Sequence, residues 1–293
     1  MFGGCGFSLE IMGAARLACT AGQLLSANTW ARDVQLKSHE AFGTSSFTEA
    51  DKGAQSFIIE GLKKEYPEAV IMGEEGEASK TSVETVLAAP LSFIIDPYDG
   101  TTEGVHDLPL WSVSIGVMKN GALIGGAISA PEIRGGLTVA SENSAGVRLT
   151  EFNRITRRID DKEPQHAKLV VQLGLDVQRL SAYHHFIGKL PKELKPRGVA
   201  PSGALGLALV ALGRVDALVQ SPQMPWDWCA GIPMCIEAGR KVRYYHIVNG
   251  KILAITAPEA SSFRTDKQML GFIVGKAEIV DAISVLLSEH YGE

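Results

Sequence analysis

An acidic segment in the first half of the chain carries the residue types that bind hard cations. Asp96 and Asp99 follow the apolar run Phe93–Ile95 and are separated by Pro97 and Tyr98. Because proline restricts its own backbone, both carboxylates can turn toward one ion while the Tyr98 carbonyl offers another oxygen. Oxygen-only donor sets are typical of Mg²⁺ and Ca²⁺. The segment therefore predicts a site for a hard divalent cation.

The same segment continues into Gly100, Thr101 and Thr102. If a helix opens after Asp99, the backbone N–H groups of these three residues form a seat for an anion beside the cation. A metal ion and a phosphate group would then be adjacent. The composition also fits a β-turn, so this segment alone leaves a simple turn open as the alternative.

Two more acidic elements stand where sites are commonly built. Glu74 and Glu75 follow a strand predicted over residues 69–72, and Asp227 precedes a predicted helix that ends near Gly239. Open α/β sheets place their binding residues at strand ends and at the helix starts that follow them. Taken singly, Asp227 is also a good helix N-cap, and the two glutamates fit a solvated loop.

Together these segments resemble the inositol monophosphatase family. That family belongs to a superfamily of metal-dependent, lithium-sensitive phosphatases with fructose-1,6-bisphosphatases and 3′,5′-bisphosphate nucleotidases. The resemblance rests on ordered motifs, which are Thr48-Glu49-Ala50-Asp51, Glu74-Glu75, Asp96-Pro97-Tyr98-Asp99-Gly100-Thr101, and Trp226-Asp227 followed by Gly239. Several ordered motifs at family spacing are rare by chance, although each one alone is ambiguous.

The resemblance implies an α/β protein with a layered αβαβα sugar-phosphatase fold. We expect a mixed α+β N-terminal half over residues 1–160 and an α/β C-terminal half over residues 161–293, packed as one unit around the metal site. A charged stretch over residues 151–167 marks the predicted boundary. Apolar periodicity predicts helices over 7–27, 49–66, 203–212 and 277–287. It predicts strands over 69–72, 91–95, 169–172, 215–219 and 272–274, and a hairpin over 111–128 with a type I′ turn at Asn120-Gly121.

The resemblance also implies two or three Mg²⁺ ions per site. Their implied ligands are the carboxylates of Asp51, Glu74, Asp96, Asp99 and Asp227 and the carbonyl oxygen of Tyr98. Asp96 would bridge two ions, one of them also bound by Glu74 and the other by Asp227. A third, water-rich ion would lie near Glu74 and Asp51.

The implied catalytic residues are Thr101, Asp51 and Glu74, which would orient and deprotonate the attacking water. Glu75 would support the site without binding metal. The implied substrate contacts are Gly100, Thr101, Thr102, Gly203, Gln220 and Asp99.

These assignments imply a Mg²⁺-dependent hydrolase of a small polyol or sugar monophosphate that forms a homodimer. Activity on a 3′(2′),5′-bisphosphate nucleotide, which Glu103 favours and Thr102 disfavours, is one alternative, and a fructose-1,6-bisphosphatase-like activity is another. A regulatory binding protein that kept the fold is the non-enzymatic alternative. Gln220 replaces the acid of inositol-preferring members, so the polyol itself is open. Other departures from the family pattern are Pro201, Pro233 and Arg240.

Composition argues against other functional classes. The chain has 28 Lys and Arg against 33 Asp and Glu, a net charge of −5, which provides no electrostatic footprint for nucleic acid. Its longest apolar run, Gly203–Gly213, is shorter than the roughly 18 residues of a membrane helix. The 4 cysteines lack CxxC spacing. We therefore expect free thiols and a cytoplasmic protein that acts on a small phosphorylated substrate.

Overall fold

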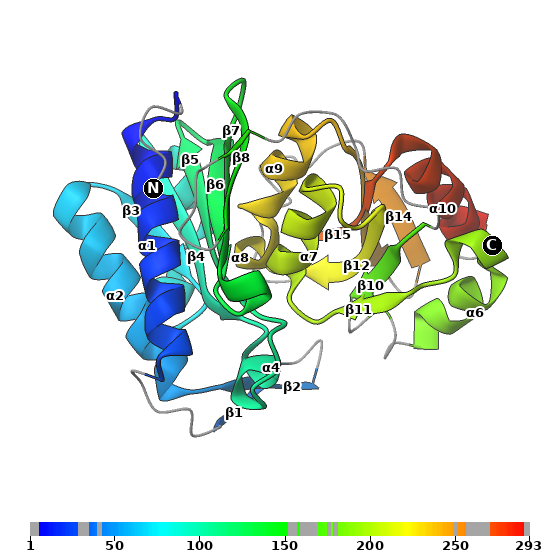
Figure 1. Cartoon of the computed structure of the whole chain (residues 1–293), viewed down its shortest axis with the longest axis horizontal. Coiled ribbons are helices and arrows are strands. Elements are labelled where there is room, and N and C mark those ends of the chain that lie inside the picture. The colour runs from blue at the N-terminus through cyan, green and yellow to red at the C-terminus, as the bar shows by residue number, and fades with distance from the viewer. Residues whose placement is uncertain are drawn as a thin grey trace.

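The computed structural model describes residues 6–28, 35–39, 43–151, 157–158, 169–174, 177, 181–248, 251–255 and 270–289. Two β-sheets alternate with layers of helices (Figure 1). The outer layer on one side contains α1 (Leu9–Ser26) and α2 (Glu49–Glu65). The central layer contains α7 (Gly203–Ala211), α8 (Pro225–Trp228) and α9 (Gly231–Glu237), and the outer layer on the other side contains α6 (Ser181–Lys189) and α10 (Ala277–Glu289). The layered α/β prediction is confirmed.

The first sheet has seven strands and is antiparallel except for the parallel pair of β3 and β4. In spatial order it contains β3 (Val70–Gly73), β4 (Leu91–Asp99), β5 (Ser112–Lys119), β6 (Ala122–Ala130), β7 (Leu137–Glu142), β8 (Gly146–Glu151) and β9 (Arg157–Arg158). The short helices α3 (Val83–Ala88) and α4 (Thr101–Val105) flank β4 in the chain. The predicted hairpin is present as β5 and β6, and positive φ angles of 50° at Asn120 and 74° at Gly121 fit a type I′ turn.

The second sheet has six strands and mixes parallel with antiparallel pairs. In spatial order it contains β11 (Gly198–Ala200), β10 (Val171–Gly174), β12 (Ala217–Gln223), β15 (Leu270–Gly275), β13 (Lys241–Val248) and β14 (Lys251–Ile255). Strand β10 is parallel to both of its neighbours, whereas β12, β15, β13 and β14 form antiparallel pairs. A separate hairpin contains β1 (Gln35–His39) and β2 (Gly43–Phe47).

Most predicted elements match the observed ones, with several boundaries shifted; β12, predicted over 215–219, spans Ala217–Gln223. The strand predicted over 91–95 continues as β4 to Asp99, because its ladder with β5 resumes after Pro97. Pro233 lies early in α9 and has no N–H to donate to the Cys229 carbonyl, so α8 and α9 are two short helices rather than one. The predicted domain boundary falls mainly on residues 152–156 and 159–167, outside the described residues.

Three apolar cores separate the layers. The core between the first sheet and the outer helices includes Ile11 and Ile58, both fully buried. The core between the two sheets surrounds α7, whose residues are apolar on nearly every side because it is covered all round. The third core lies beneath α6 and α10. Cys19, Cys229 and Cys235 are buried free thiols, as predicted for these described cysteines.

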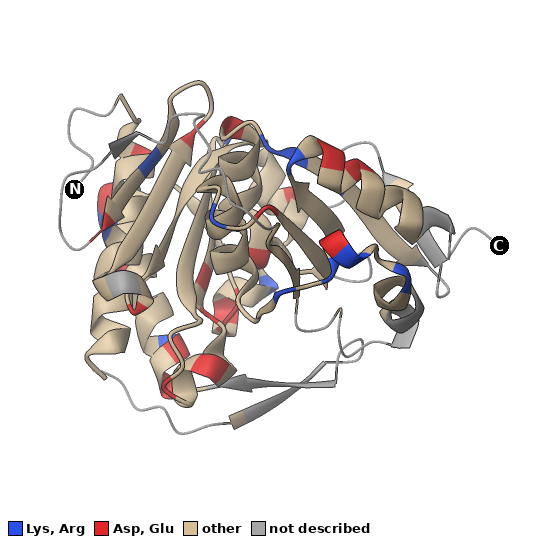
Figure 2. Cartoon of the chain, turned by 45° about the vertical axis from the view of Figure 1, so that its right-hand side comes forward, with Lys and Arg blue, Asp and Glu red and all other residues tan. Residues whose placement is uncertain are grey.

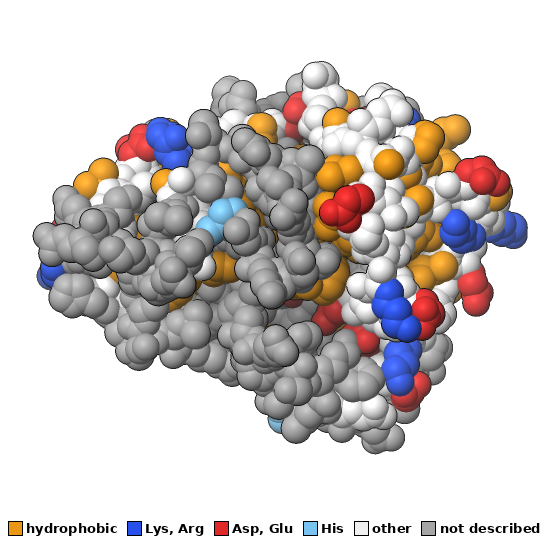
Figure 3. Space-filling view, turned by 180° about the vertical axis from the view of Figure 1, so that it is seen from behind, with side chains coloured by type: hydrophobic (Ala, Val, Ile, Leu, Met, Phe, Trp, Pro, Cys, Tyr) orange, Lys and Arg blue, Asp and Glu red, His pale blue; other side chains and the backbone are white. Residues whose placement is uncertain are grey.

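The surface of α2 carries charges of both signs. Lys52 donates to Glu49 at 2.8 Å, and both side chains are exposed. Seen from behind, blue and red side chains lie together on the side where α2 packs (Figure 3). Exposed pairs of this kind contribute at most about 1 kcal/mol to stability. Within the described ranges, no helix has the length and apolar character needed to cross a membrane.

The central helices approach the first sheet closely at Gly116 on β5. A Cβ atom at Gly116 would lie 2.7 Å from the Cβ of Cys229, which directly follows α8. Cβ atoms do not approach one another this closely, and β5 is held by ladders on both sides. A side chain at Gly116 would therefore push the α8 segment away from the sheet.

We expect Gly116→Ala to lower the free energy of unfolding by about 1–3 kcal/mol, because overpacking a tight contact forces a backbone shift. Chemical denaturation of the purified protein measures this change. Gly188→Ala is the matched control, since nothing lies within 4 Å of a Cβ at this helical position in α6. The control should be neutral or stabilising by up to about 1 kcal/mol. Equal stabilities of the two variants would show that α8 does not pack against β5 as described.

Candidate metal centre

Asp96 and Asp99 lie at the end of β4 on the same side of the first sheet. Residues three apart in a regular strand point to opposite faces. Here the register shifts, because Asp96 pairs with Ser114 and Asp99 with Ser112, so β4 contains one residue more than β5 between the two pairs. Such a bulge re-aims the side chain that follows it. Pro97 fits within the bulge because it cannot donate to a ladder. Both carboxylates therefore point toward the central helices.

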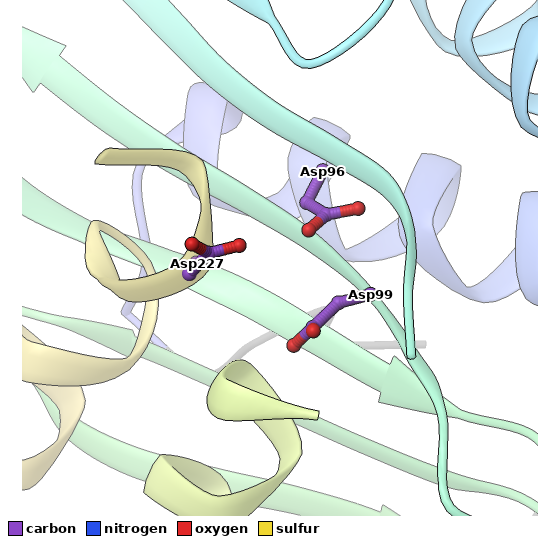
Figure 4. A group of neighbouring side chains, drawn as sticks. All are labelled: Asp96, Asp99 and Asp227. Carbon is purple, nitrogen blue, oxygen red and sulfur yellow. The ribbon is translucent and has the colours of Figure 1, made fainter. Parts of the chain in front are cut away.

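Asp227 on α8 completes the group. Its Oδ2 accepts the Met224 backbone N–H at 3.0 Å, so Asp227 lies inside the first turn of α8 rather than before the helix. Carboxylate oxygens of Asp96, Asp99 and Asp227 lie within 4.8 Å of one another. Figure 4 shows the side chains from β4 and α8 directed into a common space. Oxygens at this spacing can share a divalent cation.

The carboxylate cluster concentrates negative charge, which favours the binding of a cation. Burial raises the pKa of Asp96 and of Asp227 well above the usual range, and the neighbouring carboxylates raise it further. Glu74 contributes to both shifts, so its carboxylate lies near the same space. None of the three aspartates forms an ion pair with Lys or Arg within the described residues. Acidic residues gather where the first sheet meets the central helices (Figure 2).

Asp99 is tied to the start of α7. Its Oδ2 accepts the Ser202 hydroxyl at 2.7 Å and the Ala204 backbone N–H at 2.7 Å. The Ser112 and Ser202 hydroxyls lie 3.1 Å apart, so a short polar network crosses from β5 to α7. Burial raises the pKa of Asp99 to about 6, and these hydrogen bonds limit the shift. The sequence patterns did not identify Ser112 or Ser202 as site residues, because neither belongs to an acidic motif.

Thr101 and Asp51 form a second polar group beside the carboxylate cluster. The Thr101 hydroxyl lies 2.9 Å from Asp51 Oδ1 and 2.9 Å from the Tyr98 carbonyl oxygen. Either oxygen can accept the single proton of this hydroxyl. Asp51 Oδ2 accepts the Thr48 backbone N–H at 2.7 Å and the Thr48 hydroxyl at 2.6 Å. The Asp51 backbone N–H donates to the Thr48 hydroxyl oxygen at 3.4 Å, which completes a capping box at the start of α2. Burial raises the pKa of Asp51, and the hydrogen bonds from Thr48 and Thr101 oppose this shift.

The two glutamates occupy different environments. The Glu74 backbone N–H donates to the Ile95 carbonyl at 3.2 Å, which places Glu74 beside the end of β4. Glu75 is 3% exposed, and its backbone is held on both sides by the side-chain amide of Gln55 at 2.9 and 2.6 Å. Gln55 is a site-supporting residue that the motifs missed. Its only signal in the sequence is a polar residue among the buried positions of the helix predicted over 49–66.

The predicted substrate contacts surround the same space. Gly100 precedes α4 with a left-handed φ of 91°, and Thr102 lies exposed in the first turn of α4. Gly203 begins α7 next to the network of Asp99. Gln220 on β12 is 3% exposed, and a Cβ at Gly203 would lie 3.2 Å from Gln220 Nε2 and 3.7 Å from Asp227 Cβ. The structure places Gly203 near both Gln220 and Asp227, and Gly100 and Thr102 at the start of α4; their contacts with a substrate stay a prediction.

The chain was compared with known proteins. The model of the inositol monophosphatase family matches residues 10–275. A Thermotoga maritima protein named fructose-1,6-bisphosphatase/inositol-1-monophosphatase is 29% identical over 83% of this chain and 82% of its own length. The Nus factor SuhB of Escherichia coli is 31% identical over 82% of this chain and 89% of its own length. Among solved structures, an IMPase of Thermotoga maritima superposes with a TM-score of 0.70, 27% identity and coverage of 96% and 99% of the two chains.

We expect the metal-free protein to lose stability as the pH rises from 5 to 7.5. Asp96, Asp99 and Asp227 have a higher pKa in the folded chain than the ordinary value of 3.8, so the folded state binds their protons more tightly. The free energy of unfolding therefore falls as these groups ionise, Asp99 near pH 6. Thermal unfolding in EDTA measures this fall, which we expect to be on the order of 1–3 kcal/mol.

Mg²⁺ should raise the unfolding temperature more at pH 7.5 than at pH 5, because the cation neutralises the ionised cluster. Asp227→Asn should raise the unfolding temperature in EDTA and reduce the Mg²⁺ response. An unfolding temperature that rises with pH in EDTA and ignores Mg²⁺ would exclude the cluster as a cation site.

Proposed function

The chain belongs to the inositol monophosphatase family, and from this premise we propose that it hydrolyses the phosphomonoester of a small polyol or sugar with the help of Mg²⁺. The observation that carries the proposal is the convergence of Asp96, Asp99 and Asp227 beside the hydrogen-bonded pair of Thr101 and Asp51. The donor set fits Mg²⁺, because every ligand atom it offers is oxygen and the buried carboxylates bring excess negative charge. The aspartates of the cluster, Glu74 and the Tyr98 carbonyl would hold the ions.

When bound, the metal ions would stabilise the negative charge that develops on the phosphoryl group and on the leaving oxygen. The protein residues orient the remaining groups. The bulge in β4 aims Asp96 and Asp99 at one space, and α8 brings Asp227 to it from the other side. This arrangement requires no covalent intermediate with the protein.

Thr101 and Asp51 would handle the proton of the attacking water. The Thr101 hydroxyl donates its proton toward Asp51 Oδ1, which leaves an oxygen lone pair free to accept a proton from a water molecule. Burial brings the pKa of Asp51 closer to neutral, where a carboxylate is a more effective base. Both oxygens of Asp51 already accept hydrogen bonds from Thr48 and Thr101, which favours this role over metal binding.

The substrate class follows from what surrounds the metal centre. Burial raises the pKa of Asp99, and the carboxylate of Glu103 on α4 adds to this shift, so Glu103 lies near the cluster. A negative charge there would repel a second phosphate, whereas the resemblance at Glu103 favours a bisphosphate nucleotidase; the substrate panel below distinguishes the two. Gln220 would line the pocket at Gly203 and provide an amide in place of an acid. Its Nε2 is the end nearer Gly203, where it could donate to a bound hydroxyl group.

A regulatory role is the second candidate, because several relatives are named Nus factors. A binding protein would need neither a buried acidic cluster nor a threonine hydroxyl directed at an aspartate. The two roles are also compatible in one chain. Variants that abolish phosphate release without unfolding the protein would separate them. The predicted homodimer likewise remains a proposal from the family.

Phosphate release should be detected in Mg²⁺ and lost in EDTA, with inhibition by Li⁺ and by Ca²⁺. The panel contains inositol 1-phosphate, sugar monophosphates, fructose 1,6-bisphosphate, histidinol phosphate and adenosine 3′,5′-bisphosphate. Asp96→Asn should abolish turnover, whereas Glu75→Gln should lower it by about 10–100-fold, the effect expected of a residue that supports metal ligands. Full turnover in EDTA would refute the proposed reaction. Equal losses in the two variants would show that Glu75 itself binds metal.

Thr101→Val should lower kcat by about 10²–10⁴-fold, because it removes the hydroxyl that passes the proton to Asp51. Thr101→Ser is the matched control, since it keeps the hydroxyl and should retain most of the activity. Steady-state kinetics on the best panel substrate measures both. If Thr101→Val and Thr101→Ser have the same kcat, the hydroxyl takes no part in the reaction.

A further inference from the structure

Tyr245 reaches across a neighbouring strand to touch a third one. It lies on β13, opposite Gly271 on β15, and β15 separates β13 from β12. Its hydroxyl nevertheless donates to the backbone carbonyl of Gln220 on β12 at 2.5 Å. The ring can cross only because position 271 is glycine, since a Cβ there would lie 2.4 Å from ring atom Cε2 of Tyr245. The hydrogen bond from Tyr245 to Gln220 therefore depends on glycine at position 271.

The carbonyl that Tyr245 binds stands where the sheet becomes irregular. Gln220 pairs with Phe272, but the next paired residue of β12 is Gln223, so the ladder with β15 shifts register between them. Pro222 lies inside this irregular stretch and has no N–H to contribute. A donor from outside the ladder can hold a carbonyl in place at such a point. The Tyr245 hydroxyl is such a donor and fixes the backbone of Gln220.

Tyr183 on α6 extends the contact into the outer helix layer. Its hydroxyl lies 3.0 Å from that of Tyr245, and both rings are buried, at 0% and 2% exposure. A tyrosine hydroxyl has one proton. Because Tyr245 donates its proton to Gln220, Tyr183 must be the donor to Tyr245. The order of donation therefore runs from Tyr183 to Tyr245 to the Gln220 carbonyl.

The side chain of Gln220 points to the opposite face of the same sheet. It passes over the last residue of β10, where a Cβ at Gly174 would lie 1.6 Å from Gln220 Oε1. Its Nε2 then reaches Gly203, since a Cβ there would lie 3.2 Å from Nε2 and 3.7 Å from the Cβ of Asp227, a member of the carboxylate cluster. Because this path is narrow, the side-chain amide keeps a single orientation as long as the backbone of Gln220 does not move. The tyrosine hydroxyls on the outer face of the sheet are thus linked to the amide on its inner face through the backbone of Gln220.

We propose that Tyr183 and Tyr245 are positioning residues that set substrate selectivity from the outer face of the second sheet, by fixing the backbone whose side chain lines the pocket. The proposal rests on the proposed function, in which the Gln220 amide meets a substrate hydroxyl. Neither tyrosine touches the metal centre. Their loss should therefore change substrate affinity and leave the chemical step and the metal ions alone.

The first test is Tyr245→Phe, which keeps the ring over Gly271 and removes only the hydroxyl. We expect KM for the best panel substrate to rise about 3–10-fold, as for one misplaced hydrogen bond. The values of kcat and of the Mg²⁺ concentration for half-maximal activity should change less than about twofold. Tyr183→Phe keeps the bond to Gln220 and should have a smaller effect. Tyr244→Phe is the matched control, because this adjacent buried tyrosine packs in the central core and should leave KM unchanged.

A double variant tests whether the effect passes through Gln220. In a Gln220→Ala background, Tyr245→Phe should raise KM no further, because the side chain that it positions is gone. An additional rise of the same size in that background would overturn the proposal. So would a KM for Tyr245→Phe equal to that of the unaltered protein.

A readout without catalysis separates this proposal from the proposed function. The side-chain amide resonance of Gln220, identified by its loss in Gln220→Ala, should shift in Tyr245→Phe and Tyr183→Phe but not in Tyr244→Phe. If no panel substrate releases phosphate but the resonance shifts as expected, the proposed function fails while the positioning by the tyrosines stands. An unshifted resonance in Tyr245→Phe would refute the positioning, whatever the activity.

Discussion

Asp96, Asp99 and Asp227 repel one another at close range, the first two buried and Asp227 partly exposed, and the protein around them is arranged to hold them there. Each has a donor that keeps it in position, namely the Tyr98 N–H for Asp96, the Ser202 hydroxyl for Asp99 and the Met224 N–H for Asp227. These donors belong to a bulge and two helix starts rather than to regular structure. The fold thus maintains an arrangement of charges that is unfavourable until a cation neutralises it.

The site joins the two halves of the chain. Asp99 from the first sheet binds the start of α7, and the Ser114 hydroxyl donates to the carbonyl of Trp226 in α8 at 3.2 Å. The contact of Gly116 with Cys229 brings α8 against β5 at the same junction. Because the ligands come from both sides, any change in how the central helices pack against the first sheet also moves the carboxylates. The packing of the central helices against the first sheet therefore also fixes the positions of the carboxylates.

The second sheet contributes Gln220, which has contacts on both faces of that sheet. The backbone of Gln220 accepts a hydrogen bond from the Tyr245 hydroxyl, while its side-chain amide reaches Gly203 on the inner side. This contact involves neutral groups and lies apart from the carboxylate cluster. Under our proposal, it would let the backbone of Gln220 influence substrate preference separately from the carboxylates.

Local residue types determined the acidic motifs, the helices α1, α2, α7 and α10, and the β5–β6 hairpin, because periodicity and turn chemistry act over a few neighbours. The family also followed from the sequence, through motif order. The tertiary structure alone decided that β4 continues through a bulge to Asp99, that Gln55 holds Glu75, and that Tyr245 reaches Gln220 across Gly271. These contacts join residues 20 and 25 positions apart, or depend on strand order. No local pattern encodes them, since a buried polar group takes whichever partner the folded chain brings within hydrogen-bond distance.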